Sequence, residues 1–246
     1  MERPSSDRGA GAIWLRAEPE RPRRGTPLTR ERIVDAAVAL LDEHGIEGMT
    51  MRRLAQHLTV TSTALYWHVT TKEDVLDLAV DQIFGEVSLP DASDDWRGDV
   101  RTLTLRWRAV MLRHPWAPGL IGRPMLGPNV LARTEFLQVA LVRGGVTGVE
   151  LAVLTRMVAN FVIGAALTEA TWRRSEDPDA RAAARRHLAA RQADYPTLIA
   201  SGHLDDERWS DDVLFERGLE ALLAAGGGAT RLAHPESADA PHRWGA

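Results

Sequence analysis

The segment from Thr50 to Lys72, TMRRLAQHLTVTSTALYWHVTTK, carries the side chains whose types and spacing indicate a binding chemistry. Within it, hydroxyl, phenol, indole and imidazole groups lie beside a small apolar side chain, in the set Ser62, Thr63, Ala64, Tyr66, Trp67 and His68. Groups of these kinds hydrogen-bond to base edges and phosphates and contact thymine methyl groups. The segment therefore favours binding to double-stranded DNA.

Two short helices joined by a tight turn are predicted to position these side chains. Thr50 can cap the first helix, and Thr61 or Ser62 can cap the second, because their hydroxyls accept hydrogen bonds from free backbone N–H groups. Leu65 and Val69 lie four residues apart and can point back at the first helix. This is the layout of a helix-turn-helix, whose second helix enters the major groove. A surface helical hairpin without a DNA partner would have the same caps and spacing.

Two further helices complete this region. A helix from about Thr29 to His44 has apolar residues at i, i+3, i+4, i+7 and i+8, and Gly45 ends it. Another helix, from about Lys72 to Val87, begins with acidic residues that suit the positive end of the helix dipole. We therefore predict a three-helix DNA-binding domain with a connecting helix over residues 27–87.

The rest of the chain predicts long amphipathic helices and no β-strands, so the expected fold is all-α with a second helical domain over residues 88–225. After a polar linker, the expected helices are Trp96–His114, Asn129–Gly144, Gly148–Trp172, Asp177–Ala193 and Trp209–Ala225. The apolar face of Asp177–Ala193 is mostly alanine, so this helix should be weakly held and mobile. The stretch from Tyr195 to Asp206 resembles a turn.

Both ends of the chain have the composition of disorder. Residues 226–246 are expected to be a disordered tail, and residues 1–26 a disordered basic arm. The arginines from Arg21 to Arg24 could follow the phosphate backbone or enter a minor groove. A solvated tail without DNA contact is the preferred alternative.

Composition argues against several function classes. The 246 residues include no cysteine, which excludes disulfides, thiolate catalysis and Cys-ligated zinc. No apolar run near 20 residues and no secretory signal are recognised, so we expect a cytoplasmic protein without a membrane partner. No metal-binding spacing, phosphate loop or nucleophile motif indicates an enzyme. Net charge is −4, but Arg21–Lys72 holds eight basic and five acidic residues, so positive charge gathers where DNA would lie.

The string LYWHV at Leu65–Val69, followed by Thr70-Thr71-Lys72, resembles the DNA-binding domain of the TetR family of bacterial transcriptional regulators, and especially its tetracycline-repressor branch. The resemblance covers about Leu28 to Val87 well and extends more loosely to about Ala225. It implies a repressor that a small-molecule effector releases from operator DNA. The alternatives are a helical adaptor or an enzyme that kept the fold without regulating transcription.

The resemblance also implies which residues contact DNA. Arg52 would reach DNA from the second helix, Tyr66 and Lys72 would hold phosphates, and the bases would be read by Ser62, Thr63 and Ala64, with Trp67 and His68 beside them. Two positions depart from the family. Thr59 stands where the family has glycine, so either the turn is distorted or Thr59 is strained. Thr63 stands where the tetracycline branch has proline, so base preference should differ.

The second domain resembles the ligand-binding and dimerisation domain of that branch. The candidate ligand-binding residues are Trp107, Met111, His114, Arg123, Met125, Asn129, Asn160, Thr168 and Trp172. For most of the aromatic and methionine side chains ordinary core is the preferred alternative, and for His114 it is a helix-end cap. Asn160 lies inside an apolar helix and needs either a protein partner, for example across a dimer interface, or a ligand. The positions matching the branch's metal ligands hold other residue types, Thr168 among them, so we expect no metal, no cofactor and an apolar effector.

The expected cavity lies between the Trp96–His114 helix, the proline-rich loop and the Gly148–Trp172 helix. The resemblance further implies a homodimer held together by the Gly148–Trp172 and Trp209–Ala225 helices of each chain.

Overall fold

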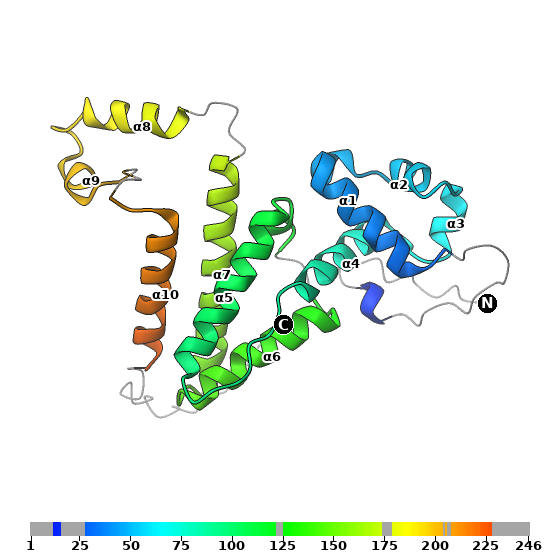
Figure 1. Ribbon diagram of the computed structural model, residues 1–246, viewed down its shortest axis with the longest axis horizontal. Coiled ribbons are helices and arrows are strands. Elements are labelled where there is room, and N and C mark those ends of the chain that lie inside the picture. Colours follow the sequence, from blue (N-terminus) through cyan, green and yellow to red (C-terminus); the bar gives the residue numbers. More distant parts are fainter. Residues whose placement is uncertain are drawn as a thin grey trace, which may run out of the picture.

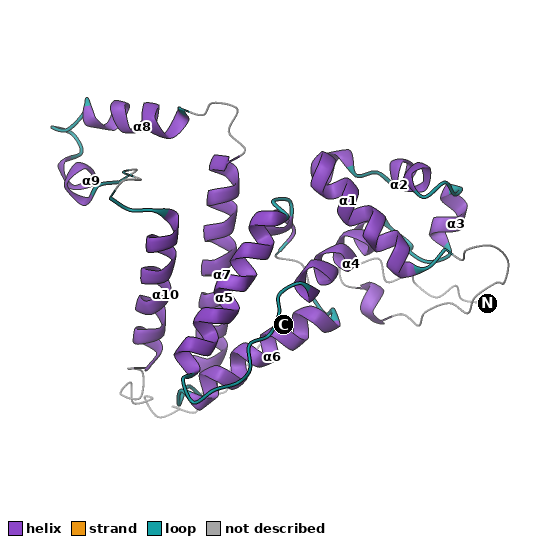
Figure 2. Ribbon diagram, in the orientation of Figure 1, coloured by secondary structure: helices purple, strands orange, loops and turns teal. Residues whose placement is uncertain are grey.

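The computed structural model describes residues 12–15, 28–121, 125–173, 179–203, 205 and 208–227. These residues form helices and turns, and none of them forms a strand, which confirms the all-α prediction (Figure 2). The α-helices are α1 Arg30–Gly48, α2 Met51–His57, α3 Ser62–Tyr66, α4 Lys72–Gly85, α5 Trp96–Arg113, α6 Pro128–Arg143, α7 Gly148–Arg173, α8 Ala180–Ala189, α9 Pro196–Ser201 and α10 Asp211–Gly227, and the 3-10 turns are η1 Ala12–Leu15 and η2 Ala117–Leu120.

A threonine begins each of the first four helices. The hydroxyls of Thr29, Thr50, Thr61 and Thr71 accept hydrogen bonds from the backbone N–H three residues later, over 3.2, 3.1, 3.2 and 3.0 Å. Asp74 completes a capping box by accepting from the N–H of Thr71. The predicted cap at Thr50 is confirmed, and Thr61 rather than Ser62 caps α3.

The end of α1 is shaped by Gly45. This residue has φ 67° and ψ −175°, a backbone conformation that residues with a Cβ avoid. It interrupts the helix at the position where the sequence predicted the helix to end. The carbonyl oxygen of Ile46, just beyond the break, accepts a 2.9 Å hydrogen bond from the ammonium of Lys72. The start of α4 is thereby fastened to the end of α1.

The C-terminal domain is a group of long helices that α4 joins to the first domain (Figure 1). Helices α5, α6 and α7 contact one another, and α10 packs along α7 and α5. The rings of Phe161 in α7 and Phe215 in α10 stack with centroids 5.2 Å apart. Helix α8 buries no residue, which agrees with the weak hold predicted from its alanine-rich face. The stretch from Tyr195 to Asp206 was expected to be turn-like, but it contains the short helix α9.

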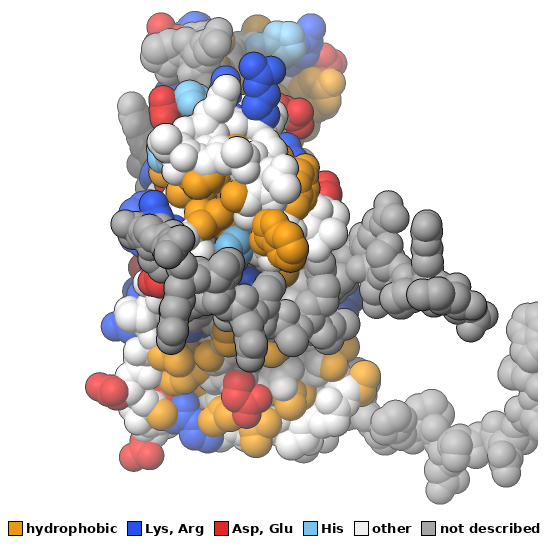
Figure 3. Space-filling model, turned by 90° about the vertical axis from the view of Figure 1, so that its right-hand side faces the viewer, with side chains coloured by type: hydrophobic (Ala, Val, Ile, Leu, Met, Phe, Trp, Pro, Cys, Tyr) orange, Lys and Arg blue, Asp and Glu red, His pale blue; other side chains and the backbone are white. Residues whose placement is uncertain are grey.

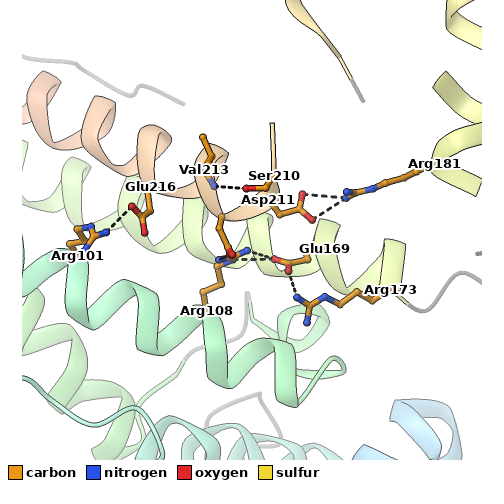
Figure 4. Close-up of polar contacts among 10 residues, drawn as sticks. Arg101, Arg108, Glu169, Arg173, Arg181, Ser210, Asp211, Val213 and Glu216 are labelled. Carbon is orange, nitrogen blue, oxygen red and sulfur yellow. Dashed lines mark hydrogen bonds and ion pairs between the residues drawn. The ribbon is translucent and has the colours of Figure 1, made fainter. Parts of the chain in front are cut away.

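Arg108 links three helices inside this domain (Figure 4). Its guanidinium donates to Glu169 of α7 over 2.6 and 3.1 Å and to Asp212 of α10 over 2.6 Å. Arg108 and Glu169 are both buried. Burial alone would lower the pKa of Arg108, but hydrogen bonds to the two carboxylates raise it. Arg108 therefore stays charged, and it fastens α10 to α5 and α7.

Two expectations about the chain are corrected. Residues 1–26 are not irregular throughout, because η1 packs on α4 with the side chain of Ile13 buried, while most of that segment lies outside the described residues. Helix α10 continues to Gly227, two residues into the tail predicted for residues 226–246, and the remainder of that tail lies outside the described residues. Within the described ranges, α7 is long and apolar enough to cross a membrane by length and composition, contrary to the expectation of no such run. Only 22% of its most apolar window is buried, so much of this helix faces outward.

Candidate DNA-binding and ligand-binding sites

Helix α3 presents a buried face and an exposed face. Leu65 is fully buried and Val69, just beyond the helix, is 1% exposed, so both point into the domain as predicted. Ser62 and Thr63 are exposed, Ala64 and His68 are partly exposed, and Tyr66 and Trp67 are 52% and 74% exposed. Figure 3 looks onto this end of the molecule and shows hydrophobic side chains gathered in patches beside a histidine. An indole this exposed contributes little to the core, so it is available to a partner.

The turn between α2 and α3 is strained at Thr59. Its φ is +57°, which makes it the one non-glycine residue with positive φ among those the structure describes. A β-branched side chain in this left-handed region crowds its own backbone, at a cost of about 1–2 kcal/mol. Of the two outcomes that the sequence left open at this position, the structure has the strained threonine.

Two basic residues lie on the helices that precede and follow α3 in the chain. Arg52 of α2 is exposed, and Lys72 at the start of α4 is partly exposed. The hydrogen bond from Lys72 to Ile46 uses one of the three ammonium hydrogens, so the other two remain able to meet a phosphate. The predicted DNA-contacting set thus lies around one short helix and its two neighbours.

A cavity of about 570 Å³ lies between α4, α5, α6, α7 and the loop before α6. Three of the predicted ligand-binding residues line it, namely Trp107, Met125 and Asn160. The ring of Trp107 contacts Phe84 of α4, with centroids 5.3 Å apart. The indole nitrogen of Trp107 is buried and has no hydrogen-bond partner among the described residues, an arrangement that costs about 1–3 kcal/mol. A ligand with an acceptor atom would relieve that cost.

Five predicted ligand-binding residues do not line this cavity. Met111 is fully buried in the core, and Thr168 is exposed on the outer face of α7. The ring of Trp172 lies under the guanidinium of Arg181, 5.3 Å from its centroid. The other two, Asn129 and His114, hold helix ends together. Arg123 lies outside the described residues.

His114 is the C-cap of α5, as the preferred alternative expected, and it joins the two domains. Its Nδ1 lies 2.7 Å from Oδ1 of Asp42 in α1, and its Nε2 lies 3.2 Å from Oε1 of Glu86 at the end of α4. Trp116 donates to the same Asp42 oxygen over 2.7 Å. Burial alone would raise the pKa of Glu86, but hydrogen bonds from Arg113 and His114 lower it. This junction couples the DNA-binding domain to the end of α5.

Asn129 belongs to a second junction, between α4 and α6. The carboxylate of Asp81 in α4 accepts from the backbone N–H of Val130 and from Nδ2 of Asn129, each over 3.0 Å. It therefore caps the start of α6 from the side. Burial raises the pKa of Asp81 despite these hydrogen bonds. Gly127 allows the close approach, because a Cβ there would lie 2.1 Å from an Asp81 oxygen.

Sequence reasoning missed the contribution of α6 to the cavity. Polar residues at the cavity that were not predicted are Arg133, Thr134, Gln138, Thr155 and Arg156. The spacing of Thr134, Leu137 and Gln138 places all three on one helix face, which was the available signal. A polar stripe on an amphipathic helix ordinarily faces solvent, so the signal alone could not separate a cavity wall from a surface.

An exposed helix-turn-helix, joined by a single helix to a domain with a cavity, is the architecture of a DNA-binding regulatory protein. Residues 33–79 match the family of bacterial regulatory proteins named tetR, and residues 89–226 match the tetracyclin repressor-like C-terminal domain. The chain therefore belongs to the TetR family of transcriptional regulators, as the LYWHV string predicted.

Known proteins agree with this assignment. The chain is 43% identical over 223 residues to an HTH-type transcriptional regulator of Saccharopolyspora erythraea, across 89% of this chain and 93% of the relative. It is 40% identical over 90 residues to the class D tetracycline repressor protein of Escherichia coli, across 35% of this chain and 41% of that protein. The crystal structure of the Streptomyces coelicolor TetR family protein ActR in complex with actinorhodin superposes with a TM-score of 0.75, at 29% identity, covering 85% of this chain and 100% of that chain.

Proposed function

We propose that this chain is a homodimeric repressor that binds operator DNA through α2 and α3 and releases it when a small molecule occupies the cavity. The observation that carries the proposal is the path of α4. The helix begins at Lys72, directly after the recognition segment, and near its other end Phe84 forms part of the cavity wall. A ligand that displaces Phe84 therefore acts on the element that carries the recognition helix.

The DNA contacts follow from exposure and chemistry. Ser62, Thr63 and Ala64 would read base edges, and Tyr66, Lys72 and Arg52 would hold phosphates, with Trp67 and His68 beside them. Release of phosphate-bound counterions makes such binding weaken as salt rises. A protein with these contacts works where the chromosome is, in the cytoplasm.

The outer faces of α7 and α10 support a homodimer. Apolar side chains stay 41–59% exposed along one side of α7 and the start of α10 in the single chain, at Val149, Val153, Met157, Leu167, Val213 and Leu214. Gly164 lies on the same side of α7, and open space surrounds the position of a Cβ there. A second copy of these two helices would cover both surfaces and form a four-helix interface.

The cavity supports control by a small molecule. Its volume of about 570 Å³ lies within the range of pockets for drug-sized ligands, roughly 300–1,000 Å³. The bound actinorhodin in the related ActR supports a ligand of that kind. To weaken operator binding 100-fold, a ligand must favour the non-binding state by about 2.7 kcal/mol.

The test of DNA binding is a gel shift with the DNA upstream of the protein's own gene. Tyr66→Phe should weaken binding roughly tenfold on every sequence that is bound, and Lys72→Ala should also reduce the salt slope by about 1. Tyr195→Phe is the matched control, because Tyr195 is similarly exposed at 46% but lies at the start of α9. If no intergenic fragment shifts at low salt, the repressor proposal is wrong and an adaptor role is favoured.

Sedimentation tests the homodimer. Met157→Glu places a charge on the proposed interface and should yield monomers at micromolar concentration. Leu131→Glu is the control, since Leu131 is 49% exposed on α6, away from that face. A wild-type monomer at micromolar concentration would contradict the proposal.

A further inference from the structure

The side chain of Arg133 lies between the cavity and the end of α4. It lines the cavity, and it also holds the end of α4. Its Nε donates to the carbonyl oxygen of Val87 over 2.9 Å, and its Nη2 donates to that of Gly85 over 3.0 Å. The last carbonyl groups of a helix have no partner within the helix, so a guanidinium at this point stabilises them. One side chain from α6 thus touches both the ligand space and the connecting helix.

The partners of Arg133 are all neutral. Its Nη1 donates to the carbonyl oxygen and to Oδ1 of Asn129, over 3.3 and 3.2 Å, so its four hydrogen bonds go to uncharged oxygens. Burial lowers the pKa of Arg133, and the nearby charge of Asp81 offsets this only in part. A guanidinium binds a carboxylate more strongly than it binds carbonyl oxygens, because the pairing is bidentate and charge-assisted.

The rest of the cavity wall has the same electrostatic bias. Arg156 of α7 also lines it, and within the described part of the chain this arginine has no hydrogen-bond or ion-pair partner. No aspartate or glutamate is found among the described residues that line the cavity. Trp107 adds an indole N–H without an acceptor. The cavity wall therefore offers hydrogen-bond donors and the positive charge of two arginines, beside an aromatic surface formed by Phe84 and Trp107.

We propose that the effector is an aromatic acid whose anionic group binds Arg133, and that this binding withdraws Arg133 from the carbonyl oxygens at the end of α4. The inference rests on the proposed function and replaces the sequence-based expectation of an apolar effector. An aromatic body fits the wall at Phe84 and Trp107, and the anionic group fits the guanidinium of Arg133, with Arg156 on the same cavity wall.

The release of α4 follows from the same contacts. Glu86 lies between the two carbonyl groups that Arg133 holds, and its carboxylate meets His114, which in turn meets Asp42 of α1. When Arg133 turns to the ligand, the last turn of α4 loses its cap on the cavity side. The junction with the DNA-binding domain then moves with it, so the signal reaches α1.

Two pairs of probes test the charge of the ligand on the full-length protein. The first pair is 1-anilinonaphthalene-8-sulfonate and N-phenyl-1-naphthylamine, which differ only in the sulfonate and fluoresce in apolar sites. The second is anthraquinone-2-carboxylate and its carboxamide. In at least one pair, the wild type should bind the acid about tenfold more tightly than the neutral analogue.

Two variants assign that preference to one side chain. Arg133→Gln should remove the preference while leaving affinity for the neutral member unchanged. Arg106→Gln is the matched control, because Arg106 also donates to a carbonyl oxygen after α4, that of Ser88 over 2.9 Å, but does not line the cavity. Arg133→Lys keeps the charge and should retain part of the preference, so the test stands even if Arg133→Gln melts early. Equal binding within both pairs, or a preference that survives in Arg133→Gln, would overturn the proposal.

A gel shift separates this inference from the proposed function. On a fragment that the protein binds, the preferred acid should weaken the complex at least tenfold for the wild type and Arg106→Gln. Arg133→Gln lacks the hydrogen bonds that hold the end of α4, so it should bind the fragment more weakly without any ligand, and the acid should weaken its complex no further. If operator binding occurs and no acid affects it, the inference fails while the DNA-binding function stands. If no fragment binds at all, the proposed function itself fails.

Discussion

The two domains reach their structures by different routes. In the N-terminal domain, each helix starts at a threonine whose hydroxyl meets a backbone group three residues later, so local sequence sets the helix boundaries. In the C-terminal domain, Arg108 binds residues 61 and 104 positions away, and the cavity draws its walls from four helices. Local signals therefore specify α3 and its exposed face, whereas the cavity depends on contacts that form only in the folded chain.

The largest test of this contrast removes the long-range contact. Arg108→Met should lower the free energy of unfolding by about 3–4 kcal/mol, because Glu169 is left buried with only Arg173 as a partner. Urea unfolding at a fixed protein concentration measures this. Arg101→Met is the control, since its ion pair with Glu216 is largely exposed and should be worth less than about 1 kcal/mol. Equal losses in the two variants would mean that the buried network does not hold this domain together.

A second test separates stability from recognition within α3. Leu65→Ala should cost about 2–3 kcal/mol, in the lower part of the usual range because a five-residue helix at the domain edge can shift inward. Trp67→Ala, which removes a side chain that is 74% exposed, should change stability by less than about 0.5 kcal/mol and still weaken DNA binding. Thermal melts combined with gel shifts measure both. A strongly destabilised Trp67→Ala would show that the two faces of α3 are not independent.

Thr59 offers a test in which stability increases. Thr59→Gly should stabilise the protein by about 1 kcal/mol, because glycine adopts the observed φ of +57° without strain. Thr70→Gly is a control at an exposed threonine with negative φ, and it should not stabilise. Urea unfolding of the three proteins in parallel is the measurement. No gain for Thr59→Gly would indicate that the turn relaxes around threonine in solution.

The smallest test compares an exposed alanine in a helix of each domain. Ala39→Gly in α1 should cost about 0.5–1 kcal/mol of global stability, because that helix is part of the cooperative core. Ala183→Gly in α8 should change global stability by less than about 0.5 kcal/mol, because α8 buries nothing and opens without the rest. Comparable losses would mean that α8 unfolds together with the core.

The sequence was informative where each element carries its own signal. The caps at Thr50 and Thr61 and the burial of Leu65 and Val69 followed from residue type and spacing within a few positions. The unusual backbone at Thr59 followed from the resemblance, because the family pattern has glycine there. The turn η1 was missed because one Ile-Trp pair in a Pro/Gly-rich stretch has no periodicity, and the burial of Ile13 depends on packing against α4.

The cavity was only partly predictable for the same reason. Trp107 and Met125 were recognised, but Thr168, carried over by alignment, faces outward because the axial rotation of α7 is set by its neighbours. Asn129 was expected to contact the ligand, but at the start of α6 its side-chain amide instead donates a hydrogen bond to Asp81. Arg133 looked like an ordinary charge on an amphipathic helix. Its role depends on the carbonyl groups of Gly85 and Val87, which no local pattern places beside it.

Helix α8 is weakly packed and α10 is firmly packed, and this difference determines where a protease would cut the folded chain first. Because α8 buries no side chain, its backbone opens easily and a cut there is expected before any cut in the core. The fragment beginning after such a cut still contains α10, which Arg108 and the stacked rings of Phe161 and Phe215 hold against α5 and α7. The two pieces of a nicked chain would therefore remain associated and separate only under denaturing conditions.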